Sequence, residues 1–182
     1  MTAPAALNLP ALHLQVVRES KRLKLDMGAG AYPRAEDFVT VDQFYPDADI
    51  KALMWDVPLP DGSVDEIWSS HALEHVAMGQ VSATLLEWFR LLAPGARCIV
   101  QVPNFDYAAR YWLNGPDRAW AEHLIFGLQS HEGEFHKSAF TAGSLKADLE
   151  GAGFHVERVE YKLTHNQETL QACARKPEGT SA

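Results

Sequence analysis

The sequence predicts an α/β fold in which strands and helices alternate around a mostly parallel sheet. Short apolar runs end in turn or polar residues, and an amphipathic stretch separates two of them. A nearly continuous apolar run at residues 97–102 is typical of a strand buried on both faces. With 182 residues, the chain suits one domain over 1–182, with its core at about 22–175 and flexible ends.

The first half of the chain is expected to supply four strands and one helix. The strand candidates are short apolar runs bounded by turn residues: 22–27, 38–42, 52–56 and 64–70. Pro58 follows the third run and favours a loop, because proline lacks a backbone donor and fixes φ. Residues 76–92 carry apolar side chains at helical spacing and predict an amphipathic helix.

The second half is expected to end the sheet with an antiparallel hairpin. Thr141 suits the N-terminal cap of a helix that runs to about Ala152. Two strand candidates follow with a short connection between them: 154–161 and 169–174. Residues 104–136 give no clear pattern, and the tail from Lys176 onward looks disordered.

Composition narrows the classes of function. A formal net charge of -8 argues against broad attraction to phosphate backbones, so no nucleic-acid partner is expected. No apolar run approaches the roughly 20 residues that a membrane helix needs. The N-terminus lacks the pattern of a secretory signal, and Cys98 and Cys173 lie in strand-like runs. A reducing cytoplasm is the simplest expected location.

A glycine turn after the first strand is the main functional signal. Gly28 and Gly30 follow the run 22–27 and can adopt positive φ, which lets a ligand lie against the backbone. Asp42 ends the next strand and can accept hydrogen bonds from ribose hydroxyls. Together they predict a site for a nucleoside-bearing ligand. The link from Gly30 to Phe38 is too short for a crossover helix, which predicts a shortened first crossover.

From about residue 22 to 175 the chain resembles the class I S-adenosylmethionine-dependent methyltransferases. It is most similar to a small bacterial type 11-like group associated with polysaccharide biosynthesis genes. The motifs that carry the resemblance are Leu25-Asp-Met-Gly-Ala-Gly30, Val41-Asp42, Trp55-Asp56-Val-Pro-Leu-Pro-Asp-Gly-Ser-Val-Asp65, Ser70-His-Ala-Leu-Glu-His75, Glu87-Trp-Phe-Arg-Leu-Leu-Ala-Pro-Gly95 and Gly151-Ala-Gly-Phe154. The resemblance implies a Rossmann-like sheet of seven strands and S-adenosyl-L-methionine as cofactor.

The resemblance also implies positions for the cofactor. The turn would face its methionine part, Asp42 its ribose, and Asp56 with Val57 its adenine, while Ser70 and His71 would lie beside the sulfonium. The expected cofactor-binding residues are Asp26, Gly28, Gly30, Asp42, Asp56, Val57, Ser70 and His71. Tyr32 stands where the family usually has a third glycine.

Histidines supply the catalytic candidates. His136 lies in a polar stretch with His131 and Glu134, and its imidazole could accept a hydroxyl proton during methyl transfer. His71 is the second candidate base. His71, Glu74 and His75 have the spacing of one helical face, which suits a catalytic or metal cluster or simple packing of the pocket. We expect no metal. His123 has a weaker claim and could simply face a helix surface.

Five aromatic residues leave three interpretations open. They could line a sugar or aromatic acceptor pocket, pack in the core, or form a homodimer interface. These residues are Tyr107, Tyr111, Trp112, Trp120 and Phe126.

The predicted function is methyl transfer from S-adenosylmethionine to a small-molecule or glycan-precursor acceptor, with an oxygen as the methylated atom. One alternative is a protein that binds the same cofactor without turnover. The other is a nicotinamide-dependent oxidoreductase, although Pro33 stands where the nicotinamide fingerprint needs a glycine. A phosphate-binding loop with a Gly-Lys-Ser/Thr sequence is missing.

Overall fold

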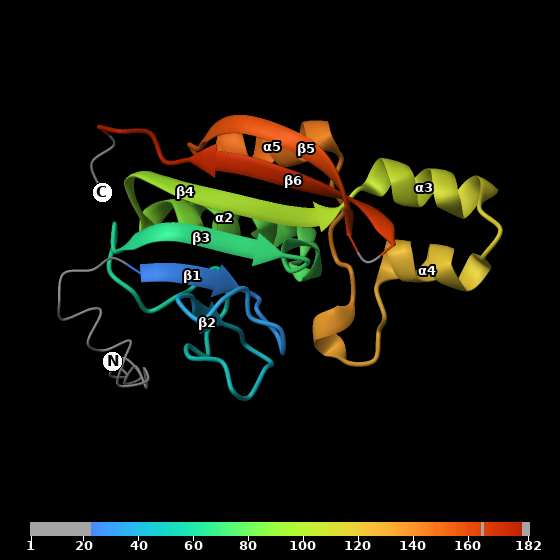
Figure 1. Ribbon diagram of the computed structural model, residues 1–182, viewed down its shortest axis with the longest axis horizontal. Helices are drawn as coiled ribbons and strands as arrows, with labels where there is room; N and C mark the ends of the chain where they lie inside the picture. Colours follow the sequence, from blue (N-terminus) through green and yellow to red (C-terminus); the bar gives the residue numbers. More distant parts are fainter. Residues whose placement is uncertain (1–22, 165, 180–182) are drawn as a thin grey trace.

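The computed structural model describes residues 23–164 and 166–179, which form a six-stranded sheet with helices (Figure 1). Its strand order is β2-β1-β3-β4-β6-β5. Four strands pair in parallel: β1 Leu23–Met27, β2 Val39–Val41, β3 Val64–Ser70 and β4 Leu92–Pro103. Two antiparallel strands complete the sheet: β5 His155–Thr164 and β6 Gln167–Arg175. The predicted α/β fold with its C-terminal hairpin is confirmed.

The helices occupy two places around this sheet. α2 (Val81–Leu91) and α5 (Ala142–Gly151) lie behind the sheet in Figure 1. α3 (Phe105–Asn114) and α4 (Arg118–Phe126) pack on each other beyond the carboxyl end of β4. Three short 3-10 turns complete the described helical structure: η1 Leu73–His75, η2 Met78–Gln80 and η3 Glu132–Glu134.

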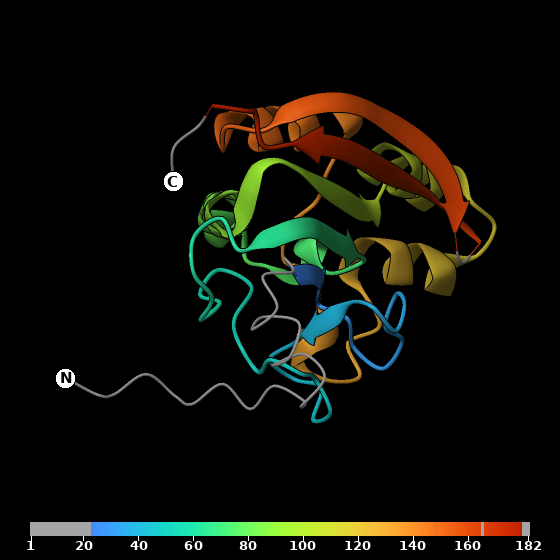
Figure 2. The ribbon, with the colours of Figure 1, turned by 60° about the vertical axis from the view of Figure 1, so that its left-hand side comes forward.

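The core lies between the sheet and the helices behind it. Leu25 and Ile67 on the strands and Leu85 and Trp88 on α2 are fully buried. Buried apolar residues recur every second position on β1, at Leu23, Leu25 and Met27, and every third or fourth position on α2, at Val81, Leu85 and Trp88. Each element therefore turns one apolar face to the core. Figure 2 shows the twist that carries the sheet from β2 at one edge to β5 at the other.

The predicted number of seven strands is not confirmed, because the described residues form six. Residues 52–56 make only an isolated antiparallel bridge between Leu53 and Asp56. The edge beyond β2 carries a single parallel bridge between Val41 and Ile50. The amide of Asp56 donates to the carbonyl of Leu53 at 3.0 Å, so these residues form a tight turn and not an extended strand.

Other boundaries also differ from the sequence predictions. The predicted helix at 76–92 begins only at Val81, after the two 3-10 turns. Thr141 caps α5 as predicted, with a capping box to Ser144. Lys176, expected to be disordered, is 2% exposed, and its Nζ donates to the carbonyls of Phe89 and Leu92 at the end of α2. Residue 22 and the tail beyond 179 lie outside the described residues.

The link between β1 and β2 contains turns and no helix, as its length predicted. The glycine turn therefore leads into an extended loop rather than into a helix N-terminus. Among the described residues, no helix is long and apolar enough to cross a membrane.

Candidate functional site

A cavity of about 710 Å³ lies at the carboxyl ends of the parallel strands β1, β2 and β3. Pockets for small ligands commonly measure about 300–1,000 Å³. Five segments line it: 28–32, 42–46, 54–55, 71–77 and 131–137. Parallel strands point all their carboxyl ends to one edge of a sheet, so loops that are distant in sequence meet there.

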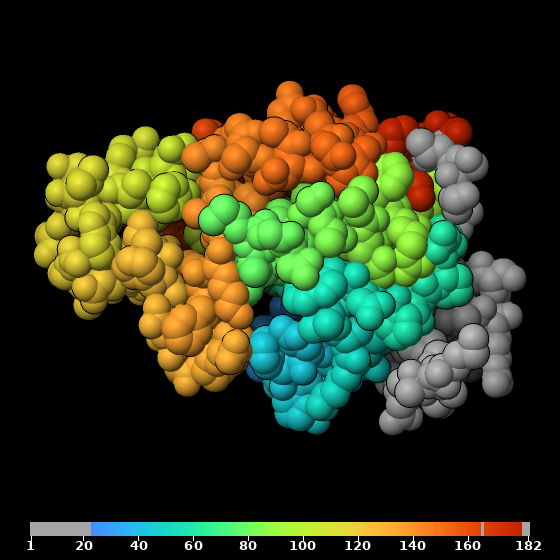
Figure 3. All heavy atoms as spheres, turned by 180° about the vertical axis from the view of Figure 1, so that it is seen from behind, coloured from blue at the N-terminus to red at the C-terminus, as the bar shows by residue number. Residues whose placement is uncertain are grey.

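The loop 131–137 closes the cavity against the segment after β2. The ring centroids of Phe44 and His131 lie 6.1 Å apart. A Cβ at Gly133 would lie only 2.8 Å from the Phe44 ring, so this glycine permits the close approach. Figure 3 shows the two segments, in blue and in orange, meeting on the surface.

The glycine turn lines the cavity, and its two glycines differ in what surrounds them. Gly28 has φ of 71°, and a Cβ there would lie 2.3 Å from Cβ of Ala72. Gly30 has φ of 55°, and a Cβ there would meet nothing within 4 Å. Gly28 therefore lets the turn pack against the start of η1, while Gly30 leaves open space beside the backbone.

Asp42 joins the turn to the segment after β2. Its Oδ2 accepts from the amide of Gly30 at 3.0 Å, and its Oδ1 accepts from the amides of Phe44 and Tyr45 at 2.7 and 2.9 Å. A carboxylate can accept about four hydrogen bonds. Asp42 lines the cavity, so it both orders the cavity wall and keeps acceptor capacity for a ligand.

Asp26, at the end of β1, is buried behind the cavity wall. Its side-chain Oδ2 accepts from the amide of Arg34 at 2.7 Å, and the residue is 3% exposed. Burial raises the pKa of this carboxyl group above its usual range, against the opposing effects of Arg34. Asp26 therefore holds the loop after the turn and does not line the cavity.

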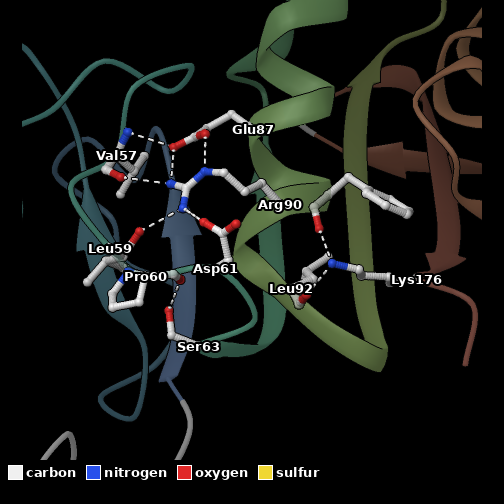
Figure 4. A network of polar contacts seen from close by, with 10 residues as sticks. Val57, Leu59, Pro60, Asp61, Ser63, Glu87, Arg90, Leu92 and Lys176 are labelled. Atoms are coloured by element: carbon white, nitrogen blue, oxygen red, sulfur yellow. Dashed lines mark hydrogen bonds and ion pairs between the residues drawn. The ribbon is translucent and has the colours of Figure 1, made fainter. Parts of the chain in front are cut away.

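Val57 is tied into a polar network away from the cavity. Its amide donates to Oε1 of Glu87 at 2.9 Å, and its carbonyl accepts from Arg90 at 3.2 Å (Figure 4). Asp56 is exposed, and Ser70 donates to the side chain of Gln101 at 2.8 Å. The described cavity is lined by none of the three expected residues Asp56, Val57 and Ser70.

His71 lines the cavity at the end of β3. Its φ of 52° is unusual for a residue with a side chain, and its amide donates to the carbonyl of Gln101. Its Nδ1 lies 3.3 Å from Oε1 of Glu74, and its Nε2 lies 3.4 Å from the Thr164 hydroxyl. The imidazole is thus held between a buried carboxylate and the β5–β6 hairpin. Burial raises the pKa of Glu74, but the neighbouring histidines outweigh this and hold it below its usual range.

The structure places His136 beside Glu74 and not in the wall of the main cavity. His136 and Glu74 line a neighbouring hollow of about 10 Å³. The rings of His136 and His75 meet edge to face, with centroids 5.1 Å apart. Burial lowers the pKa of His136, while Glu74 opposes the shift. His131 and Glu134 line the main cavity.

Several cavity residues were missed by the sequence analysis. Met54 and Trp55 line the wall where Asp56 and Val57 were expected, and the carbonyl of Met54 is held by the indole of Trp88 at 3.0 Å. Trp55 directly precedes the predicted acidic residue, so the motif pointed to the right segment. Lys137 also lines the cavity, and no spacing rule marked this residue in its loop.

The aromatic residues of 107–126 pack within α3 and α4. Tyr107 faces Tyr111, with ring centroids 6.0 Å apart, and Trp112 meets Phe126 edge to face at 5.7 Å. The guanidinium of Arg118 lies 3.6 Å from the Trp112 ring centroid. The residues lining the cavity include none of these five aromatic side chains, so the structure separates them from that site.

Sequence comparison identifies one matching family profile. The profile of the family described as methyltransferase domain matches residues 10–100, which is half of the 182 residues. No curated protein matches the sequence.

Solved structures with the same fold share little sequence. An S-adenosylmethionine-dependent methyltransferase from Mesorhizobium loti is 19% identical, with 91% of this chain and 98% of that chain covered and a TM-score of 0.58. A 1,6-didemethyltoxoflavin-N1-methyltransferase from Burkholderia thailandensis, solved with S-adenosylhomocysteine, is 16% identical. The match covers 96% of this chain and 80% of that chain, with a TM-score of 0.57. The [4+2]-cyclase SpnF is 14% identical, with 92% of this chain and 82% of that chain covered and a TM-score of 0.57. At such identities the likeness concerns the fold alone.

Proposed function

The chain belongs to the methyltransferase-domain family of class I S-adenosylmethionine-dependent enzymes, and we propose that it methylates a hydroxyl group of a small-molecule or glycan-precursor acceptor. One observation carries the proposal. The cavity of about 710 Å³ brings together the glycine turn, Asp42 and His71, which come from three separate strand ends. It has the volume of a small-ligand pocket and carries both an acceptor for hydroxyl groups and an imidazole.

S-adenosylmethionine is assigned to the side of the cavity formed by β1 and β2. The open backbone at Gly30 would face its methionine part, and the remaining acceptor capacity of Asp42 would take a ribose hydroxyl. Trp55 and Met54 offer apolar surface for the adenine. Because its amide is held by Glu87, Val57 serves to position this wall.

His71 is the proposed general base at the acceptor side. When bound, S-adenosylmethionine supplies an electrophilic methyl group on a sulfonium centre and leaves as S-adenosylhomocysteine. The His71 imidazole would take the proton that the acceptor hydroxyl loses as its oxygen bonds to the methyl carbon. Glu74, with Oε1 3.3 Å from Nδ1, would stabilise the resulting imidazolium. His136 lines the adjoining hollow and is not assigned this role.

Binding of the same cofactor without methyl transfer is the second candidate. SpnF shares the fold and is described as a [4+2]-cyclase, so the fold alone does not imply methyl transfer. A nicotinamide-dependent oxidoreductase is the third, and it predicts NAD binding in the same cavity. These functions differ in the ligand bound and in the product released, so binding and turnover measurements separate them.

Calorimetry with S-adenosylmethionine, S-adenosylhomocysteine and NAD tests the cofactor. We expect the first two to bind and NAD not to bind. Asp42→Ala should weaken S-adenosylhomocysteine binding by about 1–3 kcal/mol, the scale for lost hydrogen bonds to a charged group. Asp47→Ala is the matched control, because Asp47 is exposed in the same loop and does not line the cavity.

The possible outcomes discriminate between the three functions. No binding of either sulfur compound at millimolar concentration would overturn both functions that use S-adenosylmethionine. Binding of NAD alone would support the oxidoreductase. Cofactor binding with no methylated product from a broad panel of glycans and metabolites would favour binding without methyl transfer. An unchanged dissociation constant in Asp42→Ala would remove Asp42 from the site.

A cytoplasmic location belongs to the same proposal. Cys98 and Cys173 are both buried free thiols, although their positions lie on the paired strands β4 and β6. Burial raises the pKa of Cys98 well above its usual range and keeps it a thiol. Unpaired, unreactive cysteines are expected in a reducing compartment.

A further inference from the structure

Glu74 is a buried carboxylate whose second oxygen has no hydrogen-bond partner among the described residues. Its exposed fraction is 2%. Oε1 has the contact with His71 already described, at 3.3 Å. A buried carboxylate normally accepts several hydrogen bonds or binds a cation, because leaving it unpaired is costly. The unpartnered Oε2 of Glu74 therefore indicates a further ligand at this position, such as a cation.

Two more potential ligand atoms surround this carboxylate. One ring nitrogen of His75, one of His136 and one oxygen of Glu74 all lie within 4.8 Å of one another. The hollow that Glu74 and His136 line together with mostly apolar residues measures about 10 Å³, close to the least volume of about 10–15 Å³ that holds a water molecule. An ion-sized space thus lies beside a carboxylate and an imidazole.

The orientation of His75 suits metal binding. Its Nδ1 lies 3.1 Å from the carbonyl oxygen of Phe135. A carbonyl only accepts, so Nδ1 carries the proton and Nε2 keeps its lone pair. Histidines that bind metal commonly donate their other nitrogen to a carbonyl or carboxylate in this way, which orients the ring.

We propose that Glu74, His75 and His136 form a binding site for a divalent transition-metal ion, with Zn²⁺ the best match. Two imidazoles and one carboxylate are a common set of three protein ligands for zinc and leave a fourth position for water or substrate. Ligand atoms about 3.4 Å apart suit bonds of about 2.1 Å in a tetrahedron. Side-chain adjustment of the partly exposed His75 and His136 would close the remaining distance.

The position of this site would matter for the neighbouring cavity. His75 lines the main cavity, while Glu74 and His136 line the hollow behind it. A metal ion bound through the second oxygen of Glu74 would leave Oε1 facing His71 and would place a Lewis acid beside His75 in the cavity wall. The sequence analysis considered a cluster of His71, Glu74 and His75 and expected no metal; His136, which is distant in sequence, was not part of that set.

Metal titration of the untagged full-length chain tests the proposal. After treatment with a chelator and its removal, Zn²⁺ is titrated by calorimetry and Co²⁺ is followed by its visible absorption. We expect one ion per chain and the intense bands of tetrahedral Co²⁺. Glu74→Gln, His75→Ala and His136→Ala should each weaken Zn²⁺ binding by more than about tenfold, since even residues behind the ligands contribute about 10–100-fold. His155→Ala is the matched control, because His155 is exposed on β5.

Two results would overturn the proposal. One is a wild-type chain that binds no Zn²⁺ at micromolar concentration. The other is a folded Glu74→Gln variant that binds Zn²⁺ as tightly as wild type, which would assign the ion to surface histidines. Thermal unfolding gives a second measurement: Zn²⁺ should raise the melting temperature of wild type and of His155→Ala but not of His136→Ala. Metal binding is measured without cofactor or acceptor, so its failure would leave the proposed methyl transfer untouched.

Discussion

At the residue scale, His71 combines an unusual backbone with a defined side-chain environment. Its φ of 52° places it in the left-handed region, where residues other than glycine are held only by surrounding structure. The amide bond to Gln101 and the contact with Glu74 supply that structure. This geometry holds an imidazole in the cavity wall at the end of a strand.

His71→Ala should reduce the rate of methyl transfer to an identified acceptor by about 10²–10⁴-fold, the usual contribution of a general base. Binding of S-adenosylhomocysteine should change little, and added imidazole should restore part of the rate. The measurement is kcat across pH for wild type, His71→Ala and the control His155→Ala. A wild-type rate in His71→Ala over the whole pH range would exclude His71 as the base.

Asp26 illustrates a residue whose charge opposes folding. Burial raises its pKa in the folded chain, so the folded state binds the proton more tightly than the unfolded state does. Ionisation therefore costs stability at all pH values above the raised folded pKa. This cost diminishes as the pH falls toward the unfolded value of about 3.9 and disappears below it.

Asp26→Asn should accordingly be more stable than wild type at neutral pH, because Asn keeps an oxygen that can accept from the Arg34 amide. The advantage should shrink as the pH is lowered toward about 4. Urea unfolding at a series of pH values measures it, with Asp47→Asn on the exposed surface as control. Lower stability of Asp26→Asn at neutral pH would show that the ionised carboxylate is required by the fold.

At the scale of elements, the glycine turn depends on its contact with η1. Gly28→Ala would add both backbone strain at φ of 71° and a contact of 2.3 Å with Cβ of Ala72. Gly30→Ala would add only the strain, at φ of 55° in open space. The two positions are therefore a matched pair.

We expect Gly30→Ala to lower the free energy of unfolding by about 1–2 kcal/mol for the left-handed conformation. Gly28→Ala should cost about 1–3 kcal/mol more, the scale of overpacking. Ala72→Gly in the Gly28→Ala background should recover that additional loss, because it removes the Cβ that clashes. Denaturant unfolding of the four chains measures these values. Equal losses in the two single variants would argue against the tight contact.

A second contact between elements joins α2 to the loop after residue 56 (Figure 4). The guanidinium of Arg90 donates to both carboxylate oxygens of Glu87, to the carbonyls of Val57 and Leu59, and to Asp61. These carboxylates raise the pKa of Arg90 above its usual range. A planar group with five donors can satisfy this set, and a single ammonium cannot.

Arg90→Lys should therefore lower stability although it keeps the charge, by about 1–3 kcal/mol for acceptors left unpaired. Because this loop follows Met54 and Trp55 in the cavity wall, S-adenosylhomocysteine binding should weaken as well. Calorimetry and denaturant unfolding measure both effects. Arg118→Lys, in an exposed ion pair on α4, is the control and should cost much less. A stability equal to wild type in Arg90→Lys would contradict the proposed role of the network.

At the scale of the whole molecule, the parallel strands explain which sites the sequence could predict. Gly28, Asp42 and His71 each follow directly after a strand, Gly30 lies two residues beyond Gly28, and all four line one cavity. The strand ends meet at one edge of the sheet, so position along a strand was enough to bring them together. Asp26 is the penultimate residue of β1, but its side chain accepts from the Arg34 amide and does not line the cavity.

The remaining cavity residues come from irregular segments. His131, Glu134 and Lys137 reach the cavity because the chain returns from α4 and packs on Phe44. The segment 52–57 presents Met54 and Trp55 inward and engages Val57 with Glu87. Loops carry no hydrophobic period, so nothing in the order of their residues indicates which side chain faces inward.

By itself the sequence determined the α/β class, the antiparallel end of the sheet, the helix-free link after the glycine turn and the family resemblance. Each of these rests on local periodicity or on residues that lie close together in the chain. Only the tertiary structure decided that His136 leaves the main cavity for Glu74 and that Trp55 faces inward, and that six strands form in the described residues. These outcomes depend on contacts between segments far apart in the chain, whose packing and hydrogen bonds exist only once the fold has formed.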